Sequence, residues 1–170
     1  MRRPEPRGDE SMSDTTGGAE QITAQAQVEE QNKASARRIL AEGDKKNLEF
    51  LDEVSTPDYK FYFPSNAMPI NVDEHKELWQ SFNLAFPDLT HTIKEIYADD
   101  EVVVARLILS GTHEGEFAGM PPTGKEVEFS AIEIFRFSGG KLAEFWSDGD
   151  ILSLQQQLGM ELRPKEGEKD

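Results

Sequence analysis

The spacing of apolar residues changes at Pro87, about halfway along this chain. Before this proline, apolar residues in 36–54 and 73–86 recur every three or four positions, which predicts helices, with a break at Gly43-Asp44. After it, apolar and polar residues alternate, which predicts strands. The strands expected from this alternation are 90–97, 102–112, 125–137 and 141–147. An earlier short strand is expected over 59–63, because the segment is rich in aromatic residues, and a last helix is expected over 151–158.

Helices followed by a meander of long strands indicate an α+β fold, in which helices pack on one face of a curved antiparallel sheet. A strongly curved sheet of this kind tends to form a cone with a hollow interior. An apolar wall with a few polar groups is typical of a pocket for a hydrophobic small molecule. The alternative is a cone filled by its own side chains, and the pattern does not separate the two.

The two ends of the chain differ from its centre in composition. Residues 1–34 contain few large apolar side chains. Such a segment cannot bury enough surface to offset its ordering entropy, so we predict a disordered arm. Residues 161–170 form a similar polar tail, which leaves 35–160 as the folded domain. Within that domain, 22 acidic residues stand against 11 basic ones, so the acidity belongs to the folded part.

Charge and composition exclude several classes of partner. The net charge of -15 argues against nucleic acid and anionic membranes, since both require a basic face. The absence of cysteine excludes a disulfide framework, a Cys-ligated metal and a thiol nucleophile. No apolar run approaches the roughly 18 residues of a membrane span. We therefore expect a soluble, cytoplasmic protein.

Glu133 interrupts a row of apolar residues that share one face of the expected strand 125–137. A carboxylate on a buried face is costly unless it is paired or protonated. The structural explanation is a cross-strand ion pair with Arg106 or Arg136. The functional explanation is a proton-transfer role in the interior. The pattern favours the ion pair.

His113 has the same parity as the apolar residues of the expected strand 102–112. If that face is the interior, His113 lies at the mouth of an apolar wall. A histidine in such a place is either a hydrogen-bonded core residue or a group that contacts a ligand. Spacing alone favours the core residue.

Leu142, Trp146, Asp148 and Asp150 share one face if the strand 141–147 is regular. Two carboxylates beside an indole can form an acid/base site, because an apolar wall and a helix terminus both alter the pKa of an Asp. The alternatives are that Asp150 caps the helix 151–158 and that Trp146 packs in the core. Spacing alone favours the cap.

Four segments carry a resemblance to a known family. Residues 112–124, THEGEFAGMPPTG, resemble the T-H-x-G-x-F-x-G-x-P-P-T-G signature of the SnoaL-like polyketide cyclases, also called ester cyclases. The segments AFPDL at 85–89, EFWSDGD at 144–150 and QQLG at 156–159 are similar to other conserved parts of that family. The resemblance covers about 35–160. It implies the NTF2-like fold, a cone-shaped α+β barrel.

The resemblance also implies a reaction, in secondary metabolism. Characterised members close the last ring of an aromatic polyketide by intramolecular aldol condensation, without a metal or an organic cofactor. By this resemblance Asp150 is the catalytic acid/base and His113 assists at the substrate carbonyl. A homodimer through the outer face of the sheet is expected on the same ground. The substrate pocket is expected to contain Trp146, Asp148, Glu133, Trp79 and Phe63.

Two departures from the family pattern leave the substrate open. Phe145 stands where many relatives have His, and Phe63 stands where relatives often have a polar residue. Other enzymes of the same fold, of epoxide-hydrolase or isomerase type, are alternatives, as is a non-catalytic small-molecule-binding protein. The hydrolase would need an Arg between two interior carboxylates, so outward-facing Arg106 and Arg136 would exclude it.

Overall fold

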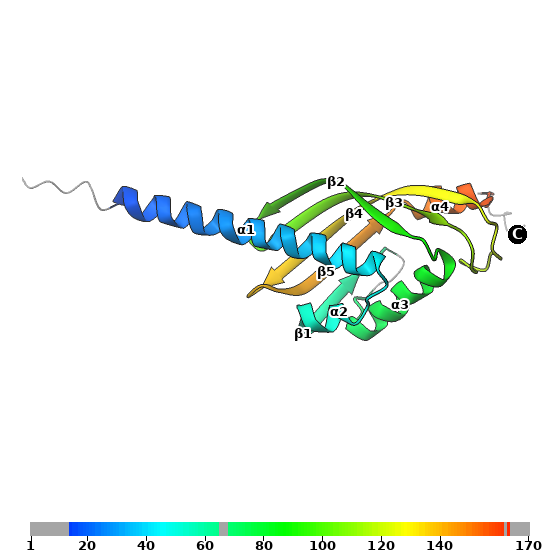
Figure 1. The fold of residues 1–170 in the computed structure, drawn as a ribbon, viewed down its shortest axis with the longest axis horizontal. Helices are drawn as coiled ribbons and strands as arrows, with labels where there is room; N and C mark the ends of the chain where they lie inside the picture. The colour runs from blue at the N-terminus through cyan, green and yellow to red at the C-terminus, as the bar shows by residue number, and fades with distance from the viewer. Residues whose placement is uncertain (1–13, 65–67, 162, 164–170) are drawn as a thin grey trace, which may run out of the picture.

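A single curved sheet of five strands organises the molecule (Figure 1). The computed structural model describes residues 14–64, 68–161 and 163. The strands follow the order β1-β5-β4-β3-β2, and neighbours are antiparallel except for the parallel pair β1 and β5. The sheet stays open, with β1 and β2 at its edges. The strands are β1 (Ser55–Tyr62), β2 (Thr90–Asp99), β3 (Val102–Thr112), β4 (Glu126–Ser138) and β5 (Lys141–Gly149).

Four helices in the described part of the chain complete the α+β fold that the sequence predicts. Helix α1 (Asp14–Asp44) packs on β2 and β3, and α3 (Val72–Ala85) packs on β1. Helix α2 (Phe50–Val54) contacts both of these helices, and α4 (Ile151–Leu158) covers part of β4. Helix α1 ends at the predicted break, which leaves Asp44 at its last position.

The N-terminal segment is helical over residues 14–34, where the composition predicted disorder. In Figure 1 this part of α1 extends beyond the sheet, and residues 20–28 are all exposed. Asn32 and Ala36 are buried, so the sheet anchors the second half of the helix. Residues rich in Ala, Gln and Glu then continue it outward, because these have high helix propensity. A segment with few apolar residues cannot contribute to the core, but it can still form a helix. Residues 1–13 and most of the predicted tail lie outside the described residues.

The alternation predicted for the long strands is confirmed in β4, where every second residue from Val127 to Phe137 is buried. This row faces the concave side of the sheet together with the buried residues of β3. Glu133 lies in the middle of the row and is only 4% exposed. The concave side is therefore an apolar wall that contains one buried carboxyl group.

Strand β5 departs from the predicted regular alternation because it contains a bulge. Phe137 pairs with Leu142, whereas the preceding Arg136 pairs with Glu144, so Ala143 is an extra residue in the ladder. The bulge reverses the faces beyond it. Leu142 is fully buried, but Trp146 lies on the other face of the sheet, next to Arg136.

Candidate active site

A cavity of about 710 Å³ lies between the concave side of the sheet and the helices. This volume is within the range of small-molecule sites, roughly 300–1,000 Å³. The predicted hollow cone is therefore favoured over a filled one. Most of the lining is apolar and much of it is aromatic, including Phe61, Phe63, Trp79, Phe82, Phe129 and Phe145.

The mouth of the cavity carries two exposed carboxylates, Asp148 and Asp150, at the end of β5. The Asp150 side chain accepts a hydrogen bond of 2.9 Å from the backbone N–H of Ser153 and so caps α4. The two explanations offered for Asp150 are thus compatible, since the residue caps a helix and lines the cavity. Solvent reaches this end of the cavity.

The opposite end is closed, and Glu133 lies there without a full set of partners. Ser147 Oγ donates to Glu133 Oε1 over 3.3 Å, while Oε2 has no hydrogen-bond partner among the described residues. Burial raises the pKa of Glu133 to about 7, partly offset by the nearby His91 and by the Ser147 hydroxyl. Glu133 therefore titrates near neutral pH.

The ion pair predicted for Glu133 is wrong. Arg106 pairs with Glu95 at 2.8 Å, and Arg136 pairs with Glu144 at 2.9 Å. All of these side chains are partly exposed, on the convex face of the sheet. Both arginines belong to the strands that contain the inward-facing row, but at positions of opposite parity. They cannot reach Glu133, and they also exclude the Asp-Arg-Asp arrangement of an epoxide hydrolase.

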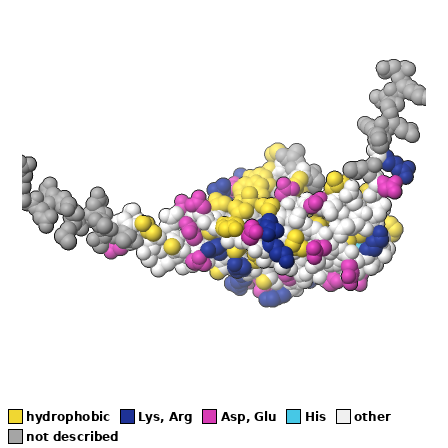
Figure 2. Space-filling view, turned by 90° about the horizontal axis from the view of Figure 1, so that it is seen from above, with side chains coloured by type: hydrophobic (Ala, Val, Ile, Leu, Met, Phe, Trp, Pro, Cys, Tyr) yellow, Lys and Arg dark blue, Asp and Glu magenta, His cyan; other side chains and the backbone are white. Residues whose placement is uncertain are grey.

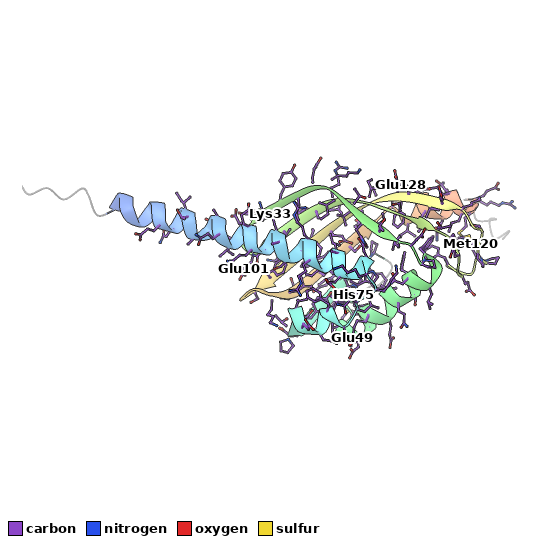
Figure 3. The ribbon with its side chains drawn as sticks, viewed as in Figure 1. Lys33, Glu49, His75, Glu101, Met120 and Glu128 are labelled. Carbon is purple, nitrogen blue, oxygen red and sulfur yellow. The ribbon has the colours of Figure 1, made fainter. Side chains whose placement is uncertain are left out.

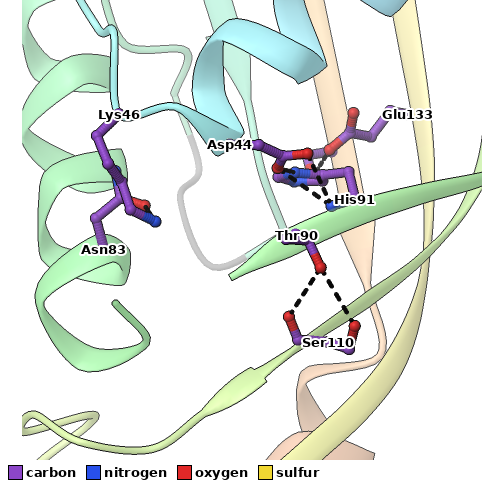
Figure 4. Close-up of polar contacts among 8 residues, drawn as sticks. Asp44, Lys46, Asn83, Thr90, His91, Ser110 and Glu133 are labelled. Atoms are coloured by element: carbon purple, nitrogen blue, oxygen red, sulfur yellow. Dashed lines mark hydrogen bonds and ion pairs between the residues drawn. The ribbon is translucent and has the colours of Figure 1, made fainter. Parts of the chain in front are cut away.

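His91 and Asp44 form a second polar group at the closed end (Figure 4). His91 Nδ1–H donates to Asp44 Oδ1 over 2.6 Å, and the His91 backbone N–H donates to the same oxygen over 3.1 Å. Burial lowers the pKa of His91, but the hydrogen bond that its ring donates to Asp44 and the charges of Glu133 and Asp44 outweigh it, so the pKa is raised. Figure 4 shows Glu133 beside this pair.

A third polar group, His75, is held neutral inside an aromatic stack. It projects from α3 toward the sheet (Figure 3) and lies between Phe61, at a centroid distance of 3.8 Å, and Trp79, at 5.4 Å. His75 Nδ1 and Tyr59 Oη share a hydrogen bond of 2.8 Å. Burial lowers the pKa of His75 to about 3, so the imidazole is uncharged at neutral pH.

The start of α3 explains how these side chains are aligned. The Asn71 side chain accepts from the backbone N–H groups of Asp73 and Glu74, and the Glu74 side chain accepts from the backbone N–H of Asn71. This complete capping box sets the first turn of the helix. His75 and Trp79, four residues apart, then share the face toward the cavity.

His113 lies outside the cavity lining, although it was predicted at its mouth. It is fully buried, its ring packs 5.3 Å from that of Phe86, and its Nδ1 accepts from the backbone N–H of Thr123 over 3.2 Å. The Thr123 hydroxyl lies 3.0 Å from the same nitrogen. His113 therefore holds the two ends of the loop between β3 and β4 together. The core interpretation of this histidine is the one that its contacts support.

Gly115 in the same loop packs against the end of α3. A Cβ at this position would lie 2.2 Å from the carbonyl oxygen of Leu84. The backbone N–H groups of Glu114 and Gly115 both donate to the carbonyl of Ala85. The motif at 112–124 thus fixes a loop whose Phe117 and Ala118 line the cavity mouth.

Five of the seven predicted site residues line one cavity, and two do not. Trp146 stacks on Tyr62 at 4.8 Å on the convex face, because of the bulge in β5, and His113 is in the core. Sequence analysis missed Asp44, His75 and His91. The residues that line the cavity as predicted are Phe63, Trp79, Glu133, Asp148 and Asp150.

Within the described ranges, no group of three or more His, Asp or Glu side chains is arranged to hold a metal ion. No helix in those ranges is long and apolar enough to cross a membrane. The polar groups of the cavity can donate, accept and transfer protons, which are the elements of general acid/base chemistry.

Comparison with known proteins relates this chain to one family and to several solved structures. The model of the SnoaL-like polyketide cyclase family matches residues 34–158. No curated protein has a significant match to the chain.

Three solved structures have the same fold. AclR from Streptomyces galilaeus, a proposed hydroxylase, is 30% identical with a TM-score of 0.69, over 75% of this chain and 95% of that one. IdmH from Streptomyces antibioticus, a proposed polyketide cyclase, is 28% identical with a TM-score of 0.69, over 76% and 99%. A proposed SnoaL-like polyketide cyclase from Jannaschia sp. CCS1 is 22% identical with a TM-score of 0.73, over 79% and 96%, and this likeness concerns the fold alone.

Proposed function

This chain belongs to the SnoaL-like polyketide cyclase family, and we propose that it catalyses a cofactor-independent cyclisation of a hydrophobic, polyketide-like small molecule. The reaction is an intramolecular aldol-type bond formation under acid/base catalysis. One observation carries the proposal: a largely apolar cavity of about 710 Å³ has a carboxylate pair at its open mouth. The apolar wall suits a polycyclic or aromatic substrate, and the carboxylates suit proton transfer.

Asp150 is the proposed general base. A C–H bond between two carbonyl groups is acidic enough for an unassisted carboxylate to remove its proton. The resulting enolate carbon attacks a second carbonyl carbon of the same molecule, a carbon–carbon bond forms, and the new alkoxide oxygen takes up a proton. The product is an isomer of the substrate, so no oxidant or cofactor is consumed. Positioning in the cavity supplies the proximity on which the ring closure depends.

Of the alternatives, only the epoxide-hydrolase type fits the site less well, and experiment distinguishes the other two. A hydrolase would need an arginine between interior carboxylates, but Arg106 and Arg136 are paired on the convex face. The isomerase type would use the same base and the same cavity, and would be recognised by its product. A purely binding protein is the outcome if ligands bind the cavity and none is converted.

The substitution Asp150→Asn tests the proposal. Asn retains the helix cap, since its side-chain oxygen can accept from the backbone N–H of Ser153. We expect turnover of a synthetic aromatic polyketide methyl ester, with an acidic C–H between two carbonyls, to fall by about 10²–10⁴-fold. Asp99→Asn, an exposed position at the end of β2, is the matched control. Equal turnover by Asp150→Asn and the parent chain would contradict the role of Asp150.

A homodimer and a cytoplasmic role in secondary metabolism are also part of the proposal. Figure 2 shows hydrophobic side chains gathered among charged ones on one face of the molecule. On the convex face of the sheet, Tyr97 is 64% and Ile132 is 41% exposed, and Trp146 is stacked on Tyr62. A second copy that covers this face would remove these groups from water.

A further inference from the structure

The closed end of the cavity combines groups from three separate elements. Asp44 comes from the last position of α1, His91 from β2 and Glu133 from β4. His91 and Glu133 both line the cavity, and they are close enough for the charge of each to alter the pKa of the other. The proposed base, Asp150, is at the other end. This cluster is therefore not needed for the first proton transfer.

His91 and Glu133 each have one polar atom that is left to bind a ligand. Asp44 occupies His91 Nδ1, so Nε2 is the ring nitrogen that remains. Ser147 occupies Glu133 Oε1, and Oε2 has no partner among the described residues, in a side chain that is 4% exposed. A buried oxygen without a partner is costly, which indicates that something else satisfies it.

The remaining groups around Glu133 do not fill this role. Tyr59 on β1 already shares its hydroxyl with His75 on α3. Ser147 on β5 already contacts the carboxyl through Oε1. Lys46 contacts Asn83, in a part of the surface that Figure 4 shows away from Glu133. A ligand in the cavity is thus the partner that the arrangement leaves open.

We propose that the closed end is a recognition site for a phenol or enol hydroxyl of the substrate. The ligand hydroxyl donates its proton to Glu133 Oε2, and the oxygen of that hydroxyl accepts from His91 Nε2–H. The inference rests on the proposed function in one respect, that the cavity is the substrate site. It narrows the substrate to a flat apolar molecule whose leading end carries a hydroxyl group.

The protonation behaviour of the two residues supports this assignment. Asp44 holds the proton on His91 Nδ1 and raises the pKa of the ring, which favours a ring that also carries the Nε2 proton. The pKa of Glu133 is raised to about 7 by burial, so the carboxyl accepts or shares a proton near neutral pH. A phenol or enol oxygen is both donor and acceptor and so matches both groups.

The test compares binding of 2-naphthol and naphthalene to the full chain at neutral pH, by calorimetry. The two probes differ only in the hydroxyl group. We expect 2-naphthol to bind at least about tenfold more tightly, because the hydrogen bonds in a dry site distinguish the two. Equal affinities, or no binding of 2-naphthol, would overturn the inference.

Two variants test whether the difference in affinity arises at Glu133 and His91. Glu133→Leu keeps a similar volume and should reduce the affinity ratio to about one, since the acceptor is lost. His91→Gln should also lower the ratio, and it serves if Glu133→Leu does not fold. Glu128→Gln, an exposed position on the same strand, should leave the ratio unchanged. A ratio that survives both substitutions in the cavity would place the hydroxyl elsewhere.

The result separates the inference from the proposed function. If 2-naphthol and naphthalene bind with equal affinity to a chain that still cyclises the polyketide ester, only the hydroxyl site is contradicted. A high ratio that depends on Glu133 and His91, in a chain with no cyclase activity, supports the site and contradicts the reaction.

Discussion

The closed end and the mouth of the cavity both carry ionisable side chains, but these side chains are buried at the closed end and exposed at the mouth. At the closed end Glu133 and His75 are each only 4% exposed, and burial shifts the pKa of both toward the uncharged form. At the mouth Asp148 and Asp150 are exposed, and Asp150 is fixed by the cap of α4. The mouth is suited to exchange protons with solvent, while the closed end is suited to hold an oxygen in a dry environment. One cavity therefore offers a substrate two distinct polar ends.

The largest expected effect concerns His75. Its pKa is about 3 in the folded chain and about 6.5 when unfolded, so the unfolded state takes up the proton first as pH falls. The free energy of unfolding is therefore highest above pH 6.5 and decreases as pH falls toward 3, by up to about 5 kcal/mol. Urea unfolding from pH 7.5 downward should show a much shallower loss for His75→Phe than for the parent chain. Parallel pH dependences for the two proteins would show that the histidine is not held neutral.

Glu133 should give an effect of opposite sign. Its folded pKa of about 7 lies above the ordinary glutamate value of 4.5, so the folded state binds the proton more tightly. The associated stability is present below pH 4.5 and is lost as pH rises through 7, by about 3 kcal/mol. The free energy of unfolding of Glu133→Gln, relative to the parent, should therefore increase between pH 4.5 and pH 8. A difference that does not change with pH would mean that the carboxyl is not desolvated.

Gly115→Ala tests whether the loop at the mouth of the cavity packs against the end of α3. The added methyl group would collide with the carbonyl of Leu84, a backbone atom that cannot move independently. We expect a loss of about 2 kcal/mol in unfolding free energy, typical of overpacking. Gly18→Ala, with no atom within 4 Å of the new Cβ, is the matched control and should cause no loss. Full stability of Gly115→Ala would show that the loop is not pressed against α3.

The smallest effect is expected for Trp146→Leu. Trp146 stacks on Tyr62 on the convex face, outside the cavity. Its removal should change the affinity for 2-naphthol by less than about twofold, since sites without shared contacts act independently. Quenching of the remaining indole, Trp79, by the ligand should persist, because Trp79 lines the cavity. A large loss of affinity would show that Trp146 contributes to the binding site.

The fold followed from the sequence because its signals are local and repeated. The change of period at Pro87 and the alternation in β4 placed the sheet and the inward position of Glu133 correctly. The failure in β5 comes from a single extra residue, Ala143, which turns Trp146 to the convex face of the sheet. A bulge of this kind leaves no mark in a pattern of apolar residues.

The closed end could not be predicted, because its contacts join distant parts of the chain. Asp44 and His91 are 47 positions apart, and each is unremarkable in its own segment. A signal was available only for Asp44, which follows Gly43 at the predicted helix break. His113 was singled out because it lies in a family motif, yet its contacts serve the loop. Of these two residues of the family motifs, Asp150 lines the cavity and His113 does not.

The most direct test of a cavity with two polar ends is a crystal structure of the full chain with 2-naphthol. We predict that the naphthol oxygen lies within hydrogen-bonding distance of both Glu133 and His91, with the rings against Trp79 and the free end toward Asp150. A naphthol whose hydroxyl faces Asp150, or one bound on the convex face of the sheet, would contradict the account.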